Sequence, residues 1–197
     1  GVLTFSVPDM NAFIRDRRSV LLGGLALTAG TALGAAQSRP SLAALAENQA
    51  SKLVAAAASQ VGVTTIYDPA YVRLVFPAGD VPRERGVCTD VIVRAYRDAF
   101  GLDLQALVNA DMRANFNRYS TRWQLKAPDT NIDHRRVDNL RVYFSRQGVE
   151  LVVPARSADW QPGDLITQEL VAPENRKPGL PHIGIISDRM APEGTRR

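Results

Sequence analysis

The sequence has one cysteine and only two histidines in 197 residues. A single cysteine excludes an internal disulfide framework and any zinc site built from several cysteines. Charge of one sign is also scarce: the formal net charge is +4, and the first 46 residues, with four arginines and two aspartates, carry half of it. So small an excess gives no reason to expect nucleic acid as a partner. We therefore predict no nucleic-acid partner, no metal and no cofactor.

Long hydrophobic runs are missing too. The most apolar segment, residues 20–36, is rich in glycine, alanine and threonine and is short for a membrane span. It follows a pair of arginines, Arg17 and Arg18, and precedes Ala44-Leu45-Ala46, where a signal peptidase would find the small residues it reads. The pattern resembles a twin-arginine export signal. We expect residues 1–46 to be a leader, a periplasmic or otherwise exported location, and no stable membrane span after signal removal.

An uncleaved N-terminal anchor is the alternative to a cleaved leader. Met10 lies where a signal of ordinary length would begin, so residues 1–9 are expected to precede the natural start.

The stretch around Cys88 predicts a helix. Apolar residues at 88, 91, 92, 95, 99 and 100 have the spacing of a helix with one buried face, and Gly101 suits the left-handed position that follows a helix. Cys88 would lie in the first turn, where free N–H groups and the helix dipole stabilise a thiolate. The alternative is a cysteine that simply packs in the core.

The rest of the mature chain predicts an α+β domain over residues 47–197. Helices are expected at 47–61, with Leu53, Val54, Ala57 and Val61 on one face, after the capping residue Asp103, and at 133–148. Strands are expected at 149–153, 164–170 and 180–188, after a loop over 115–133. Because the helices come first and the strands second, N-terminal helices should pack on a small antiparallel sheet.

A cysteine nucleophile needs a base within hydrogen-bonding reach. If the Cys88 helix packs against a strand that starts near His182, the thiolate and the imidazolium can form an ion pair. The N–H of Cys88 would then supply one donor to an oxyanion.

Three motifs resemble the NlpC-type papain-like cysteine hydrolases of bacteria: Val87-Cys88-Thr89-Asp90, Gln161-Pro162-Gly163-Asp164 and Pro181-His182-Ile183-Gly184. Segments 63–71, 86–90 and 131–137 resemble more closely an exported bacterial family called domain of unknown function 1287, and that likeness extends over roughly residues 50–188. The resemblance implies a papain-like fold and cleavage of amide bonds in cell-wall peptides. Cys88 would be the nucleophile and His182 the base.

The chain departs from the NlpC-type pattern in three ways. Thr89-Asp90 stands where Ser-Gly is usual, and an insertion over about residues 101–159 separates the cysteine from the histidine. The third polar residue of such a site normally lies on the strand after the histidine strand. We therefore expect the sheet and the catalytic set to be incomplete at the C-terminus.

Four further residues are weaker candidates for substrate, oxyanion or orienting roles. Asp90 would raise the pKa of Cys88 or face solvent. His134 is an orienting group, a substrate contact or a helix-cap or core residue. Tyr67 and Tyr71 lie where related enzymes carry an oxyanion or substrate residue, with core packing as the alternative. Arg135 and Arg136 are expected on a solvated face.

The favoured hypothesis is an exported cysteine amidohydrolase or peptidase that acts on cell-wall peptides. The alternative is a catalytically inactive papain-like domain that binds murein or a protein partner. A zinc site from Cys88, His134 and His182 needs an unusual long-range assembly. A cysteine transpeptidase would place its histidine shortly before the cysteine, and here that order is reversed. The oligomeric state is not predicted.

Overall fold

The computed structural model describes residues 3–5, 42–147, 150–170, 179–192 and 194. The helices are α2 (Leu42–Ala58), α3 (Cys88–Phe100), α4 (Leu104–Ala114) and α5 (Val137–Arg146). The strands are β1 (Leu3–Phe5), β2 (Ile66–Tyr67), β3 (Arg85–Gly86), β4 (Glu150–Leu151), β5 (Leu165–Leu170) and β6 (Leu180–Ile185). Short 3-10 turns are η1 (Phe116–Arg118), η2 (Asp133–Arg135) and η3 (Ser157–Asp159). The mixture of helices and small sheets confirms the predicted α+β class.

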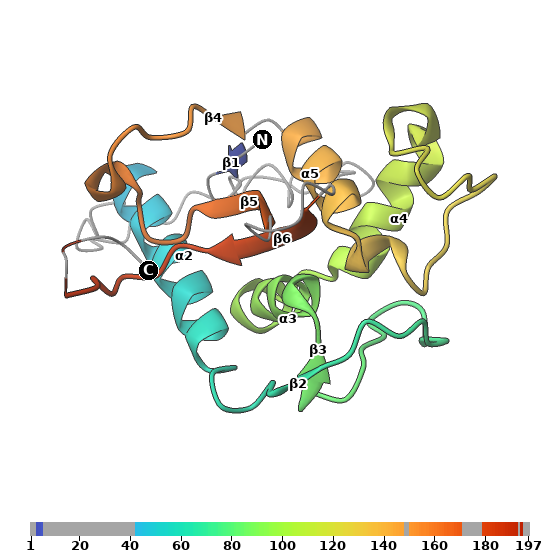
Figure 1. Ribbon diagram of the computed structural model, residues 1–197, viewed down its shortest axis with the longest axis horizontal. Coiled ribbons are helices and arrows are strands. Elements are labelled where there is room, and N and C mark those ends of the chain that lie inside the picture. Colours follow the sequence, from blue (N-terminus) through green and yellow to red (C-terminus); the bar gives the residue numbers. More distant parts are fainter. Residues whose placement is uncertain (1–2, 6–41, 148–149, 171–178, 193, 195–197) are drawn as a thin grey trace, which may run out of the picture.

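The larger sheet has the order β4-β1-β5-β6, and each neighbouring pair is antiparallel. In Figure 1 the long strands β5 and β6 lie at the centre, with α2, α3 and α5 around them. The register of β5 and β6 pairs Leu165 with Ile185 and Gln168 with His182. An antiparallel sheet in the C-terminal part was predicted from the sequence, and the structure confirms it.

The strand β1 comes from the segment that the sequence predicts to be a leader. It pairs with β4 through Thr4 and Leu151, and with β5 through Thr4 and Ile166. The N-terminal residues thus occupy an interior position of the sheet, between two strands from the last third of the chain.

Helix α3 is the centre of the core. It packs against α2 on one side and against β6 on the other. The left-handed conformation of Gly101, with φ of 66°, ends it as predicted. The fully buried side chains of the core come from four helices and the two long strands: Leu53, Ile92, Val93, Ala95, Tyr96, Leu104, Val108, Met112, Leu140, Tyr143, Phe144, Leu165 and Ile183. Burial of such side chains is the main favourable contribution to folding.

The structure shifts several predicted helix boundaries. Helix α2 begins at Leu42 rather than at residue 47 and ends at Ala58, so Val61 lies beyond it and is 83% exposed. The prediction that Val61 lies on the buried face is therefore wrong. Asp103 does cap α4, because its side chain accepts a hydrogen bond from the N–H of Gln105.

The last helix, α5, begins four residues later than predicted. It starts at Val137, and the expected cap, Asp133, is buried in η2 instead. The expected end at Gly148 lies outside the described residues. Within the described residues, no helix combines the length and the apolar character that a membrane span requires.

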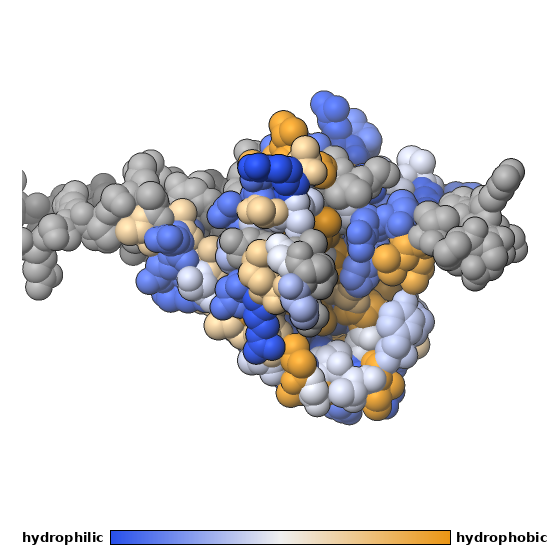
Figure 2. Space-filling view, turned by 60° about the vertical axis from the view of Figure 1, so that its left-hand side comes forward, coloured by the Kyte–Doolittle hydropathy of each residue, from blue (hydrophilic) through white to orange (hydrophobic). Residues whose placement is uncertain are grey.

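Surface hydrophobic residues concentrate on the segment between α2 and β3. Eight of the fourteen large hydrophobic residues that are exposed in the described part of the chain lie between Val61 and Phe76. On the face shown in Figure 2, hydrophobic residues form separate groups among hydrophilic ones.

Candidate active site

Cys88 is the first residue of α3, as the sequence predicts. Val87 before it is extended and has no capping side chain of its own. The N–H of Val87 instead donates to the Asp90 carboxylate, at 2.7 Å. Asp90 thus binds back across the first turn, and this fixes the peptide that leads into the cysteine.

Asp90 also holds η2 against α3. Its two carboxylate oxygens accept hydrogen bonds from Nε and Nη2 of Arg135, at 2.8 and 2.9 Å. The hydroxyl of Thr89 donates to the main-chain carbonyl of Arg135, at 2.9 Å. Thr89 and Asp90, the residues that depart from the NlpC-type pattern, therefore anchor a distant segment beside Cys88.

The burial of these groups corrects two predictions. Asp90 is 3% exposed and Arg135 is 6% exposed, so neither faces solvent. The remaining donors of Arg135 bind the carbonyls of Ala70 and Asp68, at 2.9 and 3.1 Å. A buried arginine whose three nitrogens all donate hydrogen bonds is a structural anchor, in contrast to the expected solvated residue.

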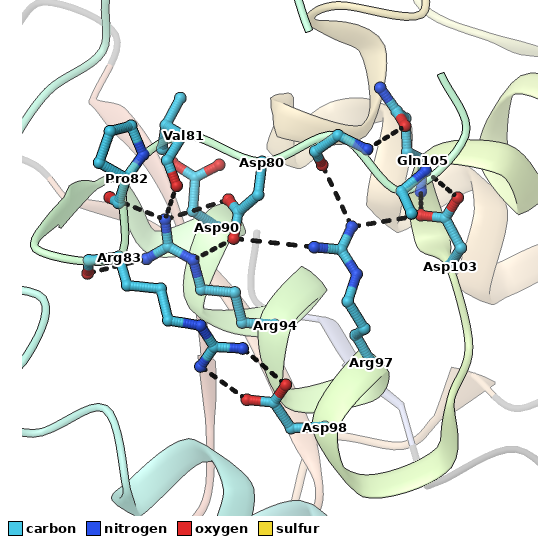
Figure 3. A network of polar contacts seen from close by, with 12 residues as sticks. Asp80, Val81, Pro82, Arg83, Asp90, Arg94, Arg97, Asp98, Asp103 and Gln105 are labelled. Carbon is cyan, nitrogen blue, oxygen red and sulfur yellow. Dashed lines mark hydrogen bonds and ion pairs between the residues drawn. The ribbon is translucent and has the colours of Figure 1, made fainter. Parts of the chain in front are cut away.

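A second buried arginine, Arg94, holds the loop before Cys88. It lies two turns along α3 and has no exposed surface. Figure 3 shows its guanidinium group enclosed by the loop, where it pairs with Asp80 at 2.8 and 3.1 Å. It also donates to the carbonyls of four loop residues: Val81, Pro82, Arg83 and Arg85. These bonds satisfy a buried charge, and they tie residues 80–85 to the helix.

The neighbouring loop is held in the same way by Gln105 of α4. Its side chain accepts from the N–H of Gly79 at 2.9 Å and donates to the carbonyls of Val75 and Thr130, at 3.1 and 3.0 Å. Arg97 of α3 adds a bond to the carbonyl of Gly79, at 3.1 Å. Polar side chains from α3 and α4 therefore hold the loop over residues 75–85, which precedes Cys88 in the chain (Figure 3).

Cys88 opens onto a cavity of about 310 Å³. The first residues of two helices meet there, because Cys88 of α3 and Val137 of α5 both line it. The other lining residues come from five segments: Tyr67, Pro69, Val87, Thr89, Arg122, Trp123, Ile132, Arg135, Arg136, Asp138, Leu180 and Pro181. A cavity of this size is at the lower end of the range for small-molecule sites, about 300 to 1,000 Å³.

The cavity wall contributed by the insertion is basic and aromatic. The guanidinium carbon of Arg136 lies 4.1 Å from the ring centre of Trp123, and that of Arg122 lies 5.9 Å from the same ring. Arg136 also pairs with the buried Asp133 at 2.9 Å. These contacts fix Arg136 and Trp123 as a stacked pair at the edge of the cavity.

The surroundings of Cys88 favour the protonated thiol. Burial raises its pKa, and the negative charge of Asp90 raises it further, while the N–H groups of Ile183 and Thr89 act in the opposite direction. A helix N-terminus alone would lower the pKa of the thiol, so the upward shift is opposite to the one that the sequence predicts. The sulfur nevertheless lies beside hydrogen-bond donors from both α3 and β6.

His182 lies on β6, one residue from the N–H group that faces the sulfur. Burial lowers its pKa, so the neutral imidazole is favoured. Among the described residues, no hydrogen bond or ion pair joins the side chains of Cys88 and His182. The structure thus brings the two chain segments together, and burial shifts the pKa values of both groups in the direction that favours their neutral forms.

The other predicted site residues lie in different surroundings. Tyr67 lines the cavity with Cys88 and is 66% exposed. Tyr71 is 56% exposed and accepts a hydrogen bond from Asn131 while donating to Asp129, at 3.0 and 3.1 Å. Core packing is therefore wrong for both tyrosines. His134 is 3% exposed and does not line the cavity, and burial lowers its pKa to about 4.

Sequence reasoning missed most of the polar side chains that build this site. Arg94 and Arg97 were not singled out, although their three-residue spacing on α3 puts both on one side of the helix. Trp123 and Arg122 fell in a segment without a period, which was expected to be a loop. Within the described part of the chain, His, Cys, Asp and Glu do not gather into a group of three suited to a metal ion.

Comparison with known proteins gives a family. The profile of the family described as Domain of unknown function (DUF1287) matches residues 54–197. The chain belongs to this family. A relative in Escherichia coli (strain K12), Uncharacterized protein YijF, is 50% identical over 139 residues, which is 71% of this chain and 64% of that protein. The DUF1287 chain therefore spans less than two thirds of this relative. No solved structure matches it.

Proposed function

We propose that this DUF1287 protein is an exported cysteine amidohydrolase or peptidase that cleaves amide bonds in cell-wall peptides. The observation that carries the proposal is the position of its single cysteine. Cys88 begins a helix and opens onto a cavity. Backbone N–H donors from α3 and β6 reach its sulfur. A papain-like arrangement and a periplasmic location belong to the same proposal.

The proposed reaction begins from the neutral pair. His182 accepts the thiol proton of Cys88 while the sulfur attacks the amide carbonyl, and main-chain N–H groups at the start of α3 stabilise the oxyanion. Collapse of the tetrahedral intermediate breaks the C–N bond, and the imidazolium returns its proton to the amine that leaves. Water then hydrolyses the thioester, with His182 taking a proton and giving it back to the thiol.

Because Cys88 and His182 share no hydrogen bond here, the proposal requires that substrate binding bring the two groups within about 3.2 Å. Asp90 is not the third member that orients His182 among the described contacts, since its oxygens are bound by Arg135 and Val87 and no hydrogen bond joins it to His182. The orienting group of His182 is not among the contacts of the described residues.

The test is digestion of purified murein by the full chain and by matched variants. Wild type should release soluble peptides, while Cys88→Ala and His182→Gln should lose at least about 100-fold in rate. Lys52→Gln, an exposed change on α2, is the control and should keep full activity. An active Cys88→Ala variant would refute the proposal.

The second candidate is a binding domain without catalysis. Two features favour it: burial and Asp90 raise the pKa of Cys88, and the contacts of the described residues include no hydrogen bond between the thiol and His182. Equal retention of wild type and Cys88→Ser on murein sacculi, without released peptides, would support this candidate instead.

A further inference from the structure

The wall of the cavity outside the Cys88 helix carries chemistry that the proposed reaction does not use. It is formed largely by residues of the insertion, above all Arg122, Trp123 and Arg136. Cleavage of a substrate amide bond by Cys88 and His182, as proposed above, needs none of these side chains. Two arginines and a tryptophan around one cavity are typical of a site that recognises an anionic group next to an apolar one.

Arg136 is held in place, and several of its N–H donors are not used by the contacts of the described residues. Its guanidinium group stacks on Trp123, and Nη1 donates to Asp133 at 2.9 Å. The described contacts use only this one of its three nitrogens. Because a guanidinium group has five N–H donors in a planar fork, the free edge can bind a carboxylate through two parallel bonds.

Arg122 is held more loosely at the same edge. Its Nη1 is 3.7 Å from Asp138, and its side chain is 58% exposed. At this separation the pair has a weak attraction and no direct hydrogen bond. Arg122 can therefore turn towards a bound anion at little cost.

The charges around the two arginines favour a carboxylate over a phosphate as the bound anion. Asp133 already pairs with Arg136, and Asp138 already lies beside Arg122. The charge of Arg136 also lowers the pKa of Asp129, so three carboxylates lie near the two arginines and a dianionic phosphate would meet no net positive charge. A single carboxylate gains the directed bonds of the fork without requiring a large excess of positive charge.

We propose that Arg136 and Arg122, with Trp123, form a carboxylate subsite of the Cys88 cavity, and that the protein selects acidic peptides. This inference rests on the proposed function for the identity of the ligand as a cell-wall peptide. The cavity of about 310 Å³ joins Cys88 and Arg136, so one short peptide can reach both. The ring of Trp123 covers the apolar part of the side chain that carries the carboxylate.

The test measures binding without turnover. The probe is a cell-wall stem tetrapeptide with free carboxylates, compared with the same peptide in which every carboxylate is amidated. The protein is the full chain with Cys88→Ala, which cannot cleave by the proposed route. Adding Trp160→Phe leaves Trp123 as the only tryptophan, so its fluorescence reports binding at the subsite.

We expect the free peptide to bind about tenfold more tightly than the amidated one, as one charge-assisted pair would give. Arg136→Gln and Arg122→Gln should reduce that preference to less than about threefold. Asp138→Asn should increase it, because the change removes a negative charge beside the ligand. Arg113→Gln, exposed on α4 and outside the cavity, should leave the preference unchanged.

The outcomes separate this inference from the proposed function. Equal affinity for the two peptides, or no binding at millimolar concentration, would overturn the subsite even if murein is cleaved. A preference that Arg136→Gln abolishes would establish the subsite even if the wild type cleaves nothing. A preference that all three arginine variants reduce equally would show a general charge effect and would overturn it as well.

Discussion

Arg135 and Asp90 form a two-point ion pair, at 2.8 and 2.9 Å, with side chains that are only 2% and 4% exposed. The pair joins η2 to the first turn of α3 and so connects the basic wall of the cavity to the helix that begins with Cys88. Because the pair is buried, removing either partner would leave the other charge without its partner and away from water, which would lower the stability of the protein.

Arg135→Met should therefore destabilise the protein by about 3 to 5 kcal/mol, because it leaves the Asp90 charge buried without its partner. Urea unfolding followed by circular dichroism measures the change. Arg83→Met is the matched control: it removes an arginine from the Arg83–Asp98 pair, whose side chains are 48% and 31% exposed. It should cost less than about 1 kcal/mol. Similar losses for both variants would contradict the assignment of Arg135 as an anchor.

The stability of the protein should fall in mild acid because of His134. Its pKa drops from 6.5 to about 4 in the folded state, mainly through burial. Since the unfolded chain binds the proton more tightly, this contribution is fully present above pH 6.5 and is lost as the pH falls towards 4. At 1.36 kcal/mol per pKa unit the contribution is roughly 3 kcal/mol.

The measurement is the free energy of unfolding of wild type and His134→Gln between pH 4 and 7. The variant should show a flatter dependence over that range. Asp133 acts in the opposite sense, because burial raises its pKa and so favours the folded state in acid. Its contribution is common to both proteins and largely cancels in the comparison. Parallel curves would show that His134 does not titrate with the shifted pKa.

Alkylation of Cys88 should report a thiol that is harder to ionise than a free cysteine. Burial and the charge of Asp90 raise its pKa, so the midpoint of the iodoacetamide rate against pH should lie above that of a free thiol. Because the chain has one cysteine, the rate needs no deconvolution. Asp90→Asn should move the midpoint down. An upward shift, in a variant shown to be folded, would rule out the direct effect of the carboxylate.

Gly86 should resist substitution more strongly than another glycine of the chain with positive φ. Its φ is 150°, and a Cβ there would lie 2.8 Å from a carboxylate oxygen of Asp90. We expect Gly86→Ala to cost about 1 to 3 kcal/mol from backbone strain, with the contact to Asp90 added. Gly62, with φ of 79° and nothing within 4 Å of a Cβ, is the control for strain alone. Equal losses of stability at the two positions would mean that Asp90 moves away from the new Cβ without a cost in free energy.

The sequence predicted the helix ends that are marked by a local capping residue. Gly101 marks the end of α3 and Asp103 the start of α4, and both act locally through the backbone. The strands β5 and β6 were predicted from their β-prone and alternating apolar residues. Element type and order could thus be inferred, while exact boundaries, such as the start of α5 at Val137, depended on the packing of η2.

The candidate site was only partly predictable, because its architecture is polar and buried. Hydrophobic periodicity assigns Asp90, Arg94 and Arg135 to the surface, whereas all three are at most 6% exposed. Each is buried because residues distant in sequence complete its hydrogen bonds, and a single sequence does not show that pairing. Cys88 could be found because a lone cysteine at a helix start is a local signal. The cavity could not, since its wall joins residues from five segments that are distant in sequence.

The enclosure of Arg94 limits which part of the protein can move when a ligand binds. Any rearrangement of residues 80–85 would strip a guanidinium group with no exposed surface of its carboxylate and carbonyl partners. Such a step is costly, so residues 80–85 should keep the same shape in the free and the bound protein. The approach of His182 to Cys88 that the proposed reaction requires must then come from other segments. Amide hydrogen exchange in residues 80–85 should therefore be equally slow with and without ligand, and faster exchange on binding would contradict this rigidity.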